Sequence, residues 1–217
     1  MNWNGHQLAG NWDVIRFYSL QHLRLSLISL VLGVTAAAPL ILIARRSRRS
    51  YSVILAVTNV LYAIPSLTLF LILATVLGLL NDKPIVVALA IYTLTIIVRN
   101  TIEGLRAVSP YVVDAARAMG YRSTRQLVHV ELPLAMPAIA AGLRVATVST
   151  ISLVSVAGII GHGGLGQMFN DGFQRRIYVE VTAALVASVV LAVALDLLLY
   201  LGQRAVTPWA RSRLVST

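Results

Sequence analysis

Five stretches of this chain are long and apolar enough to cross a lipid bilayer. They cover residues 23–43, 52–80, 84–105, 134–160 and 178–201. A helix rises about 1.5 Å per residue, so roughly 20 apolar residues cross the ~30 Å hydrocarbon core. With 58% hydrophobic and 12% charged residues, a water-soluble domain would lack enough polar side chains to cover its surface. We therefore expect an all-α polytopic membrane protein that forms one domain over residues 1–217.

The second stretch, residues 52–80, is interrupted at Pro65. Two full spans would need about 40 residues plus a turn, which is more than this stretch provides. Proline has no N–H to donate and clashes with the preceding helical turn. We therefore expect one span that is kinked or broken at Pro65, which gives about five spans in all.

Arginines indicate which side of each span faces the cytoplasm, because inner loops are enriched in Lys and Arg. With five spans, the inner side holds the larger basic set: Arg45, Arg46, Arg48, Arg49, Arg106, Arg117, Arg122, Arg125, Arg204, Arg211 and Arg213. The outer side holds Arg16, Lys83, Arg175 and Arg176. This asymmetry predicts that the N-terminus is outside and the C-terminus inside. A nucleic-acid or phosphoinositide site is the alternative reading of the first four arginines, but beside a span a topology anchor is favoured.

The inner loop over residues 109–133 is polar and carries signals for two short helices. Ser109-Pro110 suits an N-cap followed by a proline at the first helical position. Gly120 suits the turn that ends this helix. Ser123 to Gln126 has the spacing of a capping box, and the helix that it starts is expected to stop before Pro133. These signals predict a helix-turn-helix that presents one face to a partner, with Ala115, Ala116 and Met119 on one face of its first helix.

The same loop resembles the EAA loop of ABC-importer membrane subunits: Glu-Ala-Ala, three residues, Gly, nine residues, Ile, one residue, Leu-Pro. The matching residues are Asp114, Ala115, Ala116, Gly120, Val130, Leu132 and Pro133, with Asp for Glu and Val for Ile. The resemblance implies a type I ABC-importer permease fold with a cytoplasmic coupling helix that docks on an ATPase. It also implies that Ala115, Ala116 and Gly120 are contact residues. An ordinary cytoplasmic hairpin is the alternative.

A glycine-rich turn follows the fourth span, at Gly161, Gly163, Gly164 and Gly166. These residues match a dinucleotide-binding pattern, but they follow a membrane helix on the outer side, so we expect a structural turn. Ile160 to Gly166 resembles the Ile-Gly-Ala-Gly-Gly-Leu-Gly signature of importer permeases for methionine and for osmoprotectants, with His162 in place of Ala. Residues 63–67, 98–101 and 131–147 favour the glycine betaine, choline and carnitine branch.

Polar residues inside the spans are candidates for a transport path or for helix packing. The candidates are Pro65, Ser66, Arg99, Asn100, Thr147, Ser149, Thr150, Ser152 and Ser155. Charges inside a membrane cost several kcal/mol unless they are paired or wetted. We expect Asp196 to pair with Arg144 or Arg99, and snorkelling to the inner interface is the alternative.

The chain has no P-loop, since its only lysine, Lys83, lies between Asp and Pro. Its histidines are scattered and it has no cysteine, so we expect no metal and no cofactor on this chain.

The resemblance instead implies a set of partners in a bacterial cytoplasmic membrane. These are an ATPase dimer that holds ATP and Mg, a second permease subunit, identical or paralogous, and an outer substrate-binding protein. No nucleic-acid partner is expected.

The expected cargo is a quaternary-amine osmoprotectant, with methionine or another small polar solute as the alternative. A passive channel or a membrane scaffold is the competing class. A channel is expected to carry a ring of charges in a selectivity filter, and none is evident. Neither a channel nor a scaffold would explain the pattern in residues 109–133.

Overall fold

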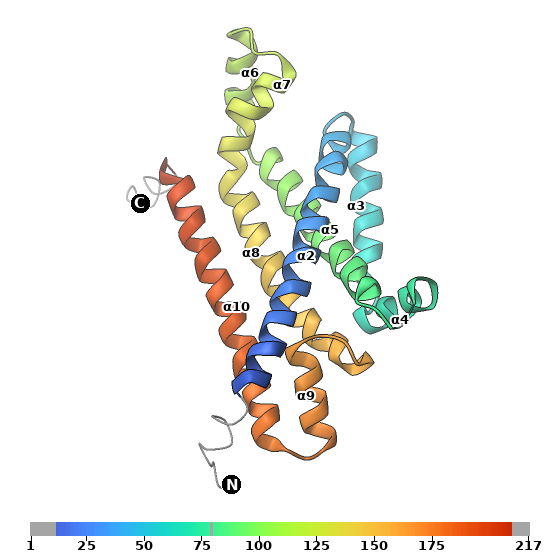
Figure 1. Cartoon of the computed structure of the whole chain (residues 1–217). Helices are drawn as coiled ribbons and strands as arrows, with labels where there is room; N and C mark the ends of the chain where they lie inside the picture. The colour runs from blue at the N-terminus through green and yellow to red at the C-terminus, as the bar shows by residue number, and fades with distance from the viewer. Residues whose placement is uncertain (1–11, 79, 210–217) are drawn as a thin grey trace.

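The computed structural model describes residues 12–78 and 80–209, and this part of the chain is built from helices (Figure 1). In chain order they are α2 (Trp12–Ala44), α3 (Arg48–Ala63), α4 (Ser66–Leu77), α5 (Lys83–Arg106), α6 (Pro110–Ala118), α7 (Ser123–Gln126), the π-helical turn η1 (Leu127–Glu131), α8 (Leu132–Ala157), the 3-10 turn η2 (Gly158–Ile160), α9 (Leu165–Gln174) and α10 (Tyr178–Val206).

Four helical segments are long and apolar enough to span a membrane: Trp12–Ala44, Lys83–Arg106, Ser123–Ile160 and Tyr178–Val206. The α3–α4 pair adds a fifth if it is one broken span. The α2–α3 turn, α6, α7 and the end of α10 lie toward one end of the molecule, while α9 and the starts of α2 and α10 lie at the other (Figure 1). The fold class expected from the sequence is confirmed. Arg211 and Arg213, two of the arginines expected on the inner side, lie outside the described residues.

The break expected at Pro65 is present, and the two helices beside it are bent by 93°. α3 ends at Ala63 and α4 starts at Ser66, so Ile64 and Pro65 form the corner. A carbonyl freed by such a break needs a new partner inside a membrane. The hydroxyl of Tyr92 on α5 supplies it, because it donates a hydrogen bond to the Ile64 carbonyl.

Two helix boundaries differ from the expectation. α2 begins at Trp12 rather than at residue 23. Hydropathy marks the part of a helix that lies in lipid, and the helical hydrogen bonds can continue beyond that part. The helix expected to stop before Pro133 continues, so that Ser123–Ile160 is one segment of 38 residues. The π-helical turn η1 ends at Glu131 and Pro133 is the second residue of α8, so the residue without an N–H falls where the hydrogen-bond ladder changes its spacing.

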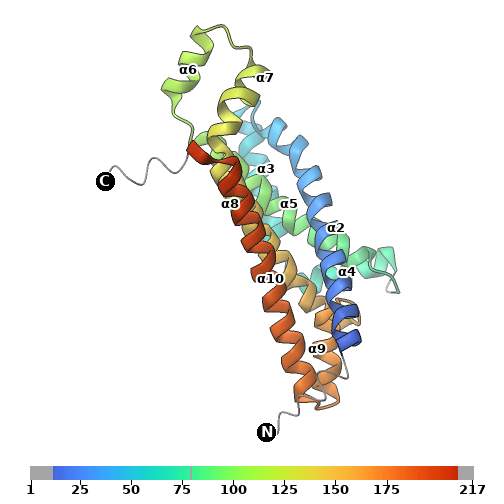
Figure 2. The same ribbon diagram turned by 60° about the vertical axis from the view of Figure 1, so that its left-hand side comes forward.

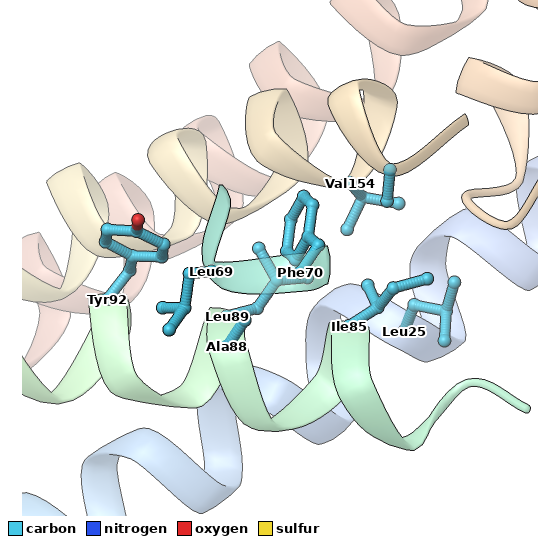
Figure 3. Close-up of a cluster of buried hydrophobic side chains, with 9 residues drawn as sticks. Leu25, Leu69, Phe70, Ile85, Ala88, Leu89, Tyr92 and Val154 are labelled. Carbon is cyan, nitrogen blue, oxygen red and sulfur yellow. The ribbon is translucent and has the colours of Figure 1, made fainter. Parts of the chain in front are cut away.

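α5 lies at the centre of the bundle. In its apolar stretch 61% of the residues are buried, whereas only 6% are buried in the apolar stretch of α10. One core cluster joins Leu25 of α2, Phe70 of α4, Leu89 of α5 and Val154 of α8 (Figure 3). α2 can approach α5 closely because Gly33 has no side chain, and a Cβ there would lie 2.5 Å from the Cβ of Thr93. Small residues at such contacts allow the van der Waals packing that holds membrane helices together.

Candidate functional site

The α6–α7 hairpin projects beyond the ends of the other helices (Figure 1, Figure 2). Pro110 is the first residue of α6, as expected. Gly120 adopts a φ of 84°, and its N–H donates to the Arg117 carbonyl at 2.9 Å. The Tyr121 N–H donates to the Ala116 carbonyl at 3.1 Å, which completes a Schellman motif. The turn expected at Gly120 is therefore confirmed.

The face that α6 offers to a partner differs from the expected one. Ala115 and Gly120 are exposed, but Ala116 is only 1% exposed and is covered by its own chain. Ala116 is therefore not a contact residue in this conformation. Met119, which the sequence placed on the same face as Ala115, is 71% exposed, and Tyr111, which the sequence reasoning missed, is 87% exposed. Large apolar side chains in a loop outside the spans were the available signal, because exposed apolar clusters mark interaction sites.

Spacing places these residues together on α6. Residues four apart lie on the same face of a helix, so Tyr111, Ala115 and Met119 form one face. Asp114 lies off that face and accepts a hydrogen bond from Arg117 at 3.2 Å; both side chains are exposed. We call Tyr111, Ala115, Met119 and Gly120 the hairpin face. It combines large apolar groups with two positions that lack bulk.

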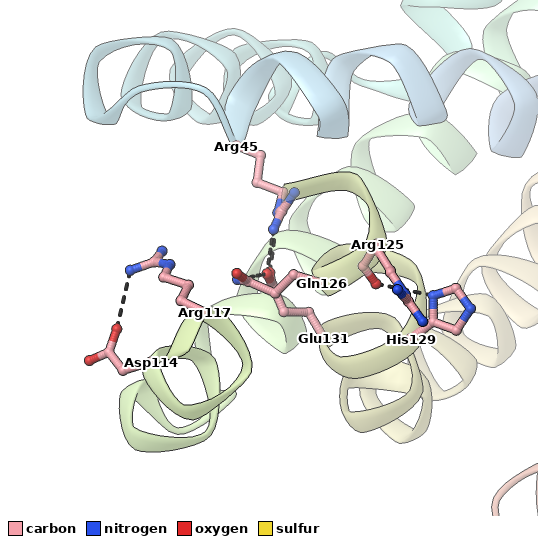
Figure 4. Close-up of polar contacts among 7 residues, drawn as sticks. All are labelled: Arg45, Asp114, Arg117, Arg125, Gln126, His129 and Glu131. Carbon is pink, nitrogen blue, oxygen red and sulfur yellow. Dashed lines mark hydrogen bonds and ion pairs between the residues drawn. The ribbon is translucent and has the colours of Figure 1, made fainter. Parts of the chain in front are cut away.

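The base of the hairpin is held by a carboxylate that the sequence reasoning did not single out (Figure 4). Glu131 accepts hydrogen bonds from both Nε and Nη2 of Arg45, at the end of α2, with the Nε bond at 3.2 Å. It also accepts one from Nε2 of Gln126 at 2.6 Å. The expected capping box is therefore wrong, since α7 has Arg122 as its N-cap and no side-chain cap. Gln126 turns to Glu131 instead, five residues on.

The last residues of the EAA-like pattern lie between the hairpin and the membrane bundle. Val130, Leu132 and Pro133 are half-buried. Leu132 packs on a cluster that contains Leu105 of α5 and Leu127 of η1. These contacts fix the hairpin to the inner ends of the spans, so we assign Leu132 a structural role.

The expected intramembrane ion pair is present between α8 and α10. Nε and Nη2 of Arg144 donate to the two carboxylate oxygens of Asp196, both at 2.7 Å. Arg144 also lies over the ring of Tyr200, 5.1 Å from its centroid. Arg99 is not the partner, because it donates to Glu103 on its own helix at 3.1 Å. The pair joins α10, which buries little else, to the bundle.

Several residues expected along a path are engaged in packing instead. Thr147 and Thr150 are buried, and Thr150 shares a hydrogen bond of 3.0 Å with Thr93 of α5. The Asn100 side chain lies where a Cβ on Gly142 would clash, which brings α5 and α8 close together. For the two buried threonines the path hypothesis gives way to helix packing, whereas Asn100 is half-buried and stays a prediction.

Other path candidates remain accessible to a solute or to a second subunit. Arg99 and Ser152 are exposed, and Ser149 and Ser155 are half-buried. At the α3–α4 corner, Pro65 is exposed and Ser66 half-buried. They stay predictions.

The glycine-rich turn holds the outer ends of several helices together. Gly161, Gly163 and Gly164 have positive φ values of 81°, 141° and 54°, as a tight turn requires. Gly166 lies in α9, where a Cβ would come within 2.2 Å of the Ser155 carbonyl oxygen. His162, inside the turn, lies 3.3 Å from Asp82 before α5.

Residues 29–212 match the family described as binding-protein-dependent transport system inner membrane component. The choline transport system permease protein OpuBB of Bacillus subtilis (strain 168) is 31% identical over 207 residues, which cover 95% of each chain. The glycine betaine/carnitine/choline transport system permease protein OpuCB of the same strain is 32% identical over 201 residues, covering 93% of this chain and 92% of that one.

The fold also matches a solved structure described as an amino acid ABC transporter with histidines, with a TM-score of 0.80. The match has 20% identity and covers 94% of this chain and all of that one. At this identity the likeness shows the fold alone. The family match covers the spans, the hairpin and the glycine-rich turn together, and the chain belongs to the binding-protein-dependent transport system inner membrane components.

Proposed function

We propose that this chain is the permease subunit of an ATP-driven importer for quaternary-amine osmoprotectants such as glycine betaine, choline and carnitine. The observation that carries the proposal is the hairpin face, on which Tyr111 and Met119 are exposed. The hairpin itself projects beyond the inner ends of the spans (Figure 1). Large exposed apolar groups of this kind mark sites where another protein docks. The EAA-like pattern lies in the same hairpin, so the partner is the ATPase.

The continuous segment Ser123–Ile160 provides the mechanical link. Its 38 residues span about 57 Å at 1.5 Å per residue, well beyond the ~30 Å of hydrocarbon. One end joins the hairpin and the other runs into the glycine-rich turn. Movement of the hairpin when the ATPase closes on ATP would therefore tilt a rigid rod that reaches the outer side. ATP binding would thus shift the population between inward-open and outward-open states.

The substrate assignment rests on the named relatives and on the chemistry of the spans. Quaternary ammonium groups are held by aromatic side chains through cation–π contacts. Phe70 is fully buried in the core. Among the described aromatic residues deep in the spans, Tyr62 is the exposed one, and it lies in edge contact with Tyr92, with ring centroids 6.0 Å apart. High-affinity recognition thus falls to the substrate-binding protein, and this chain supplies a path of transient contacts.

The test is uptake by proteoliposomes that contain this chain, its ATPase, its substrate-binding protein and internal ATP. Labelled choline and glycine betaine should accumulate, excess unlabelled betaine should compete, and excess methionine should not. Uptake blocked by methionine alone would overturn the substrate class. Uptake that needs no ATP would overturn the importer class in favour of a channel.

Gly120→Pro tests the coupling role of the hairpin. Proline fixes φ near −65° and has no N–H, so it fits neither the φ of 84° nor the bond to Arg117. This variant should abolish uptake and ATPase stimulation, and normal uptake would contradict the assignment. Gly120→Asn separates the turn from the docking surface, because asparagine tolerates positive φ and no atom of this chain lies within 4 Å of the added Cβ. It should keep the turn, so any loss of uptake in this variant reports the added bulk at the hairpin face and not a broken turn.

A further inference from the structure

A cavity of about 350 Å³ lies at the inner end of the bundle, between the α2–α3 turn and the end of α5. Four arginines line it, namely Arg45, Arg46, Arg48 and Arg106. None of the described residues that line it is acidic. The cavity is separate from the hairpin face and plays no part in the proposed function.

The charge of this cavity is largely uncompensated. Arg45 is paired with Glu131, but Arg46, Arg48 and Arg106 have no acidic partner among the described residues. Their side chains are exposed. An anion with several oxygens would satisfy these guanidinium groups, which bind phosphate in a bidentate manner.

Two further features of the cavity favour the binding of an anion. Arg106 lies over the ring of Tyr51, 4.0 Å from its centroid, so its guanidinium group is held in place. α3 begins at Arg48 with Ser47 as its N-cap, and both residues line the cavity. The start of a helix carries a partial positive charge and free N–H groups, which add to the field of the arginines.

The remaining walls are apolar and lie at the level where the lipid-facing surface ends. Ile41, Ile102 and Leu105 form the part of the lining toward the bundle. Leu42 on α2 is 52% exposed and Val53 on α3 is 55% exposed, as expected for side chains that face acyl chains. A soluble phosphate would use only the arginines, whereas a lipid would use both parts of the cavity.

We propose that this cavity binds the phosphodiester headgroup of an anionic lipid from the inner leaflet. Basic pockets between membrane helices on the cytoplasmic side recognise such headgroups. The arginines hold the phosphate and the apolar wall receives the start of the acyl chains. A bound lipid joins the ends of α2, α3 and α5 at the base of the hairpin.

The proposal is tested by titrating the purified importer complex in detergent micelles with fluorescently labelled phosphatidylglycerol. Unlabelled phosphatidylglycerol should displace the probe at far lower concentration than phosphatidylcholine. Arg46→Gln, Arg48→Gln and Arg106→Gln should each weaken binding about five-fold, as ~1 kcal/mol per basic residue implies. Arg46 and Arg48 are exposed, so their variants are expected to fold even if loss of the Arg106–Tyr51 contact destabilises the third.

Arg49→Gln is the matched control. Arg49 is on the same turn of α3 and carries the same charge, but it lines a different cavity. It should change the affinity less than about two-fold if the cavity, and not the general charge of the inner surface, binds the lipid. An effect of Arg49→Gln as large as that of Arg48→Gln would overturn the proposal. Displacement of the probe by soluble glycerol 3-phosphate as effectively as by phosphatidylglycerol would overturn the lipid as the source of the phosphate.

Discussion

Glu131→Gln should loosen the hairpin from the membrane bundle, because it weakens the contact with Arg45 and leaves the size of the side chain at position 131 nearly unchanged. Glu131 and Arg45 have side-chain exposures of 9% and 25%, so the pair is shielded from most solvent. The amide of glutamine keeps one acceptor oxygen and turns an N–H group toward the guanidinium group. At least one charge-assisted hydrogen bond is therefore lost, which costs about 1.5–3 kcal/mol.

Limited trypsin digestion of the purified permease, without its ATPase, measures this loss. Arg122 and Arg125 are exposed in the hairpin, but cleavage needs the local backbone to open. When opening is fast relative to cleavage, the rate follows the population of the open form. A loss of about 1.5–3 kcal/mol should raise the cleavage rate roughly 10- to 150-fold.

Two comparisons show whether the buried pair is responsible. Asp114→Asn removes the other carboxylate–arginine pair of the hairpin, but both side chains are more than 60% exposed, at 70% and 64%. Exposed pairs contribute about 0–1 kcal/mol, so cleavage should rise less than about five-fold. Adding Arg45→Gln to Glu131→Gln should have little further effect, because both changes break the same contact. The reasoning is refuted if Glu131→Gln accelerates cleavage no more than Asp114→Asn does.

Three further experiments test the packing of the bundle and the accessibility of the path. Gly158→Ala should prevent stable folding, because the added Cβ would lie 2.1 Å from a backbone atom of α9. The added Cβ of Gly202→Ala meets nothing within 4 Å, so this variant should gain up to ~1 kcal/mol of stability. Thermal unfolding in detergent measures both effects. Asp196→Asn should reduce assembly and transport, and the exchange of Asp196→Arg with Arg144→Asp should restore part of both. Ser152→Cys should react with a water-soluble thiol reagent if its exposed face borders the path, and the natural chain, which has no cysteine, should not react.

The spans and the hairpin could be predicted because local sequence determines them. Apolar length marks the spans, Pro65 marks the break, and Gly120 marks the turn at a position that requires positive φ. Arg144 and Asp196 could be proposed as a pair because unpaired charges are costly in a membrane. Each of these inferences needed only the sequence around the residue or a general rule about lipid.

The features that were missed depend on contacts distant in sequence. Arg45 and Glu131 are 86 residues apart, and no local pattern connects them. Ala116 fits the EAA-like pattern, but its burial depends on how the hairpin folds against itself. The helix continues past Pro133 because a π-helical turn precedes it, and this turn brings Gln126 and Glu131 together. A capping box and a helix stop were the readings favoured by local rules alone.

The contacts of α8 indicate how movement of the hairpin spreads through the subunit. Glu131 ties its inner end to α2, Arg144 ties its middle to α10, and Thr150 ties its outer half to α5. A helix fixed to three neighbours cannot bend alone, so force on the hairpin moves the bundle as one body. If the chain pairs with a second permease subunit, as the resemblance implies, alternating access would arise where the two subunits meet. We infer that the gate is formed by exposed polar residues such as Arg99 and Ser152, and not by the buried threonines.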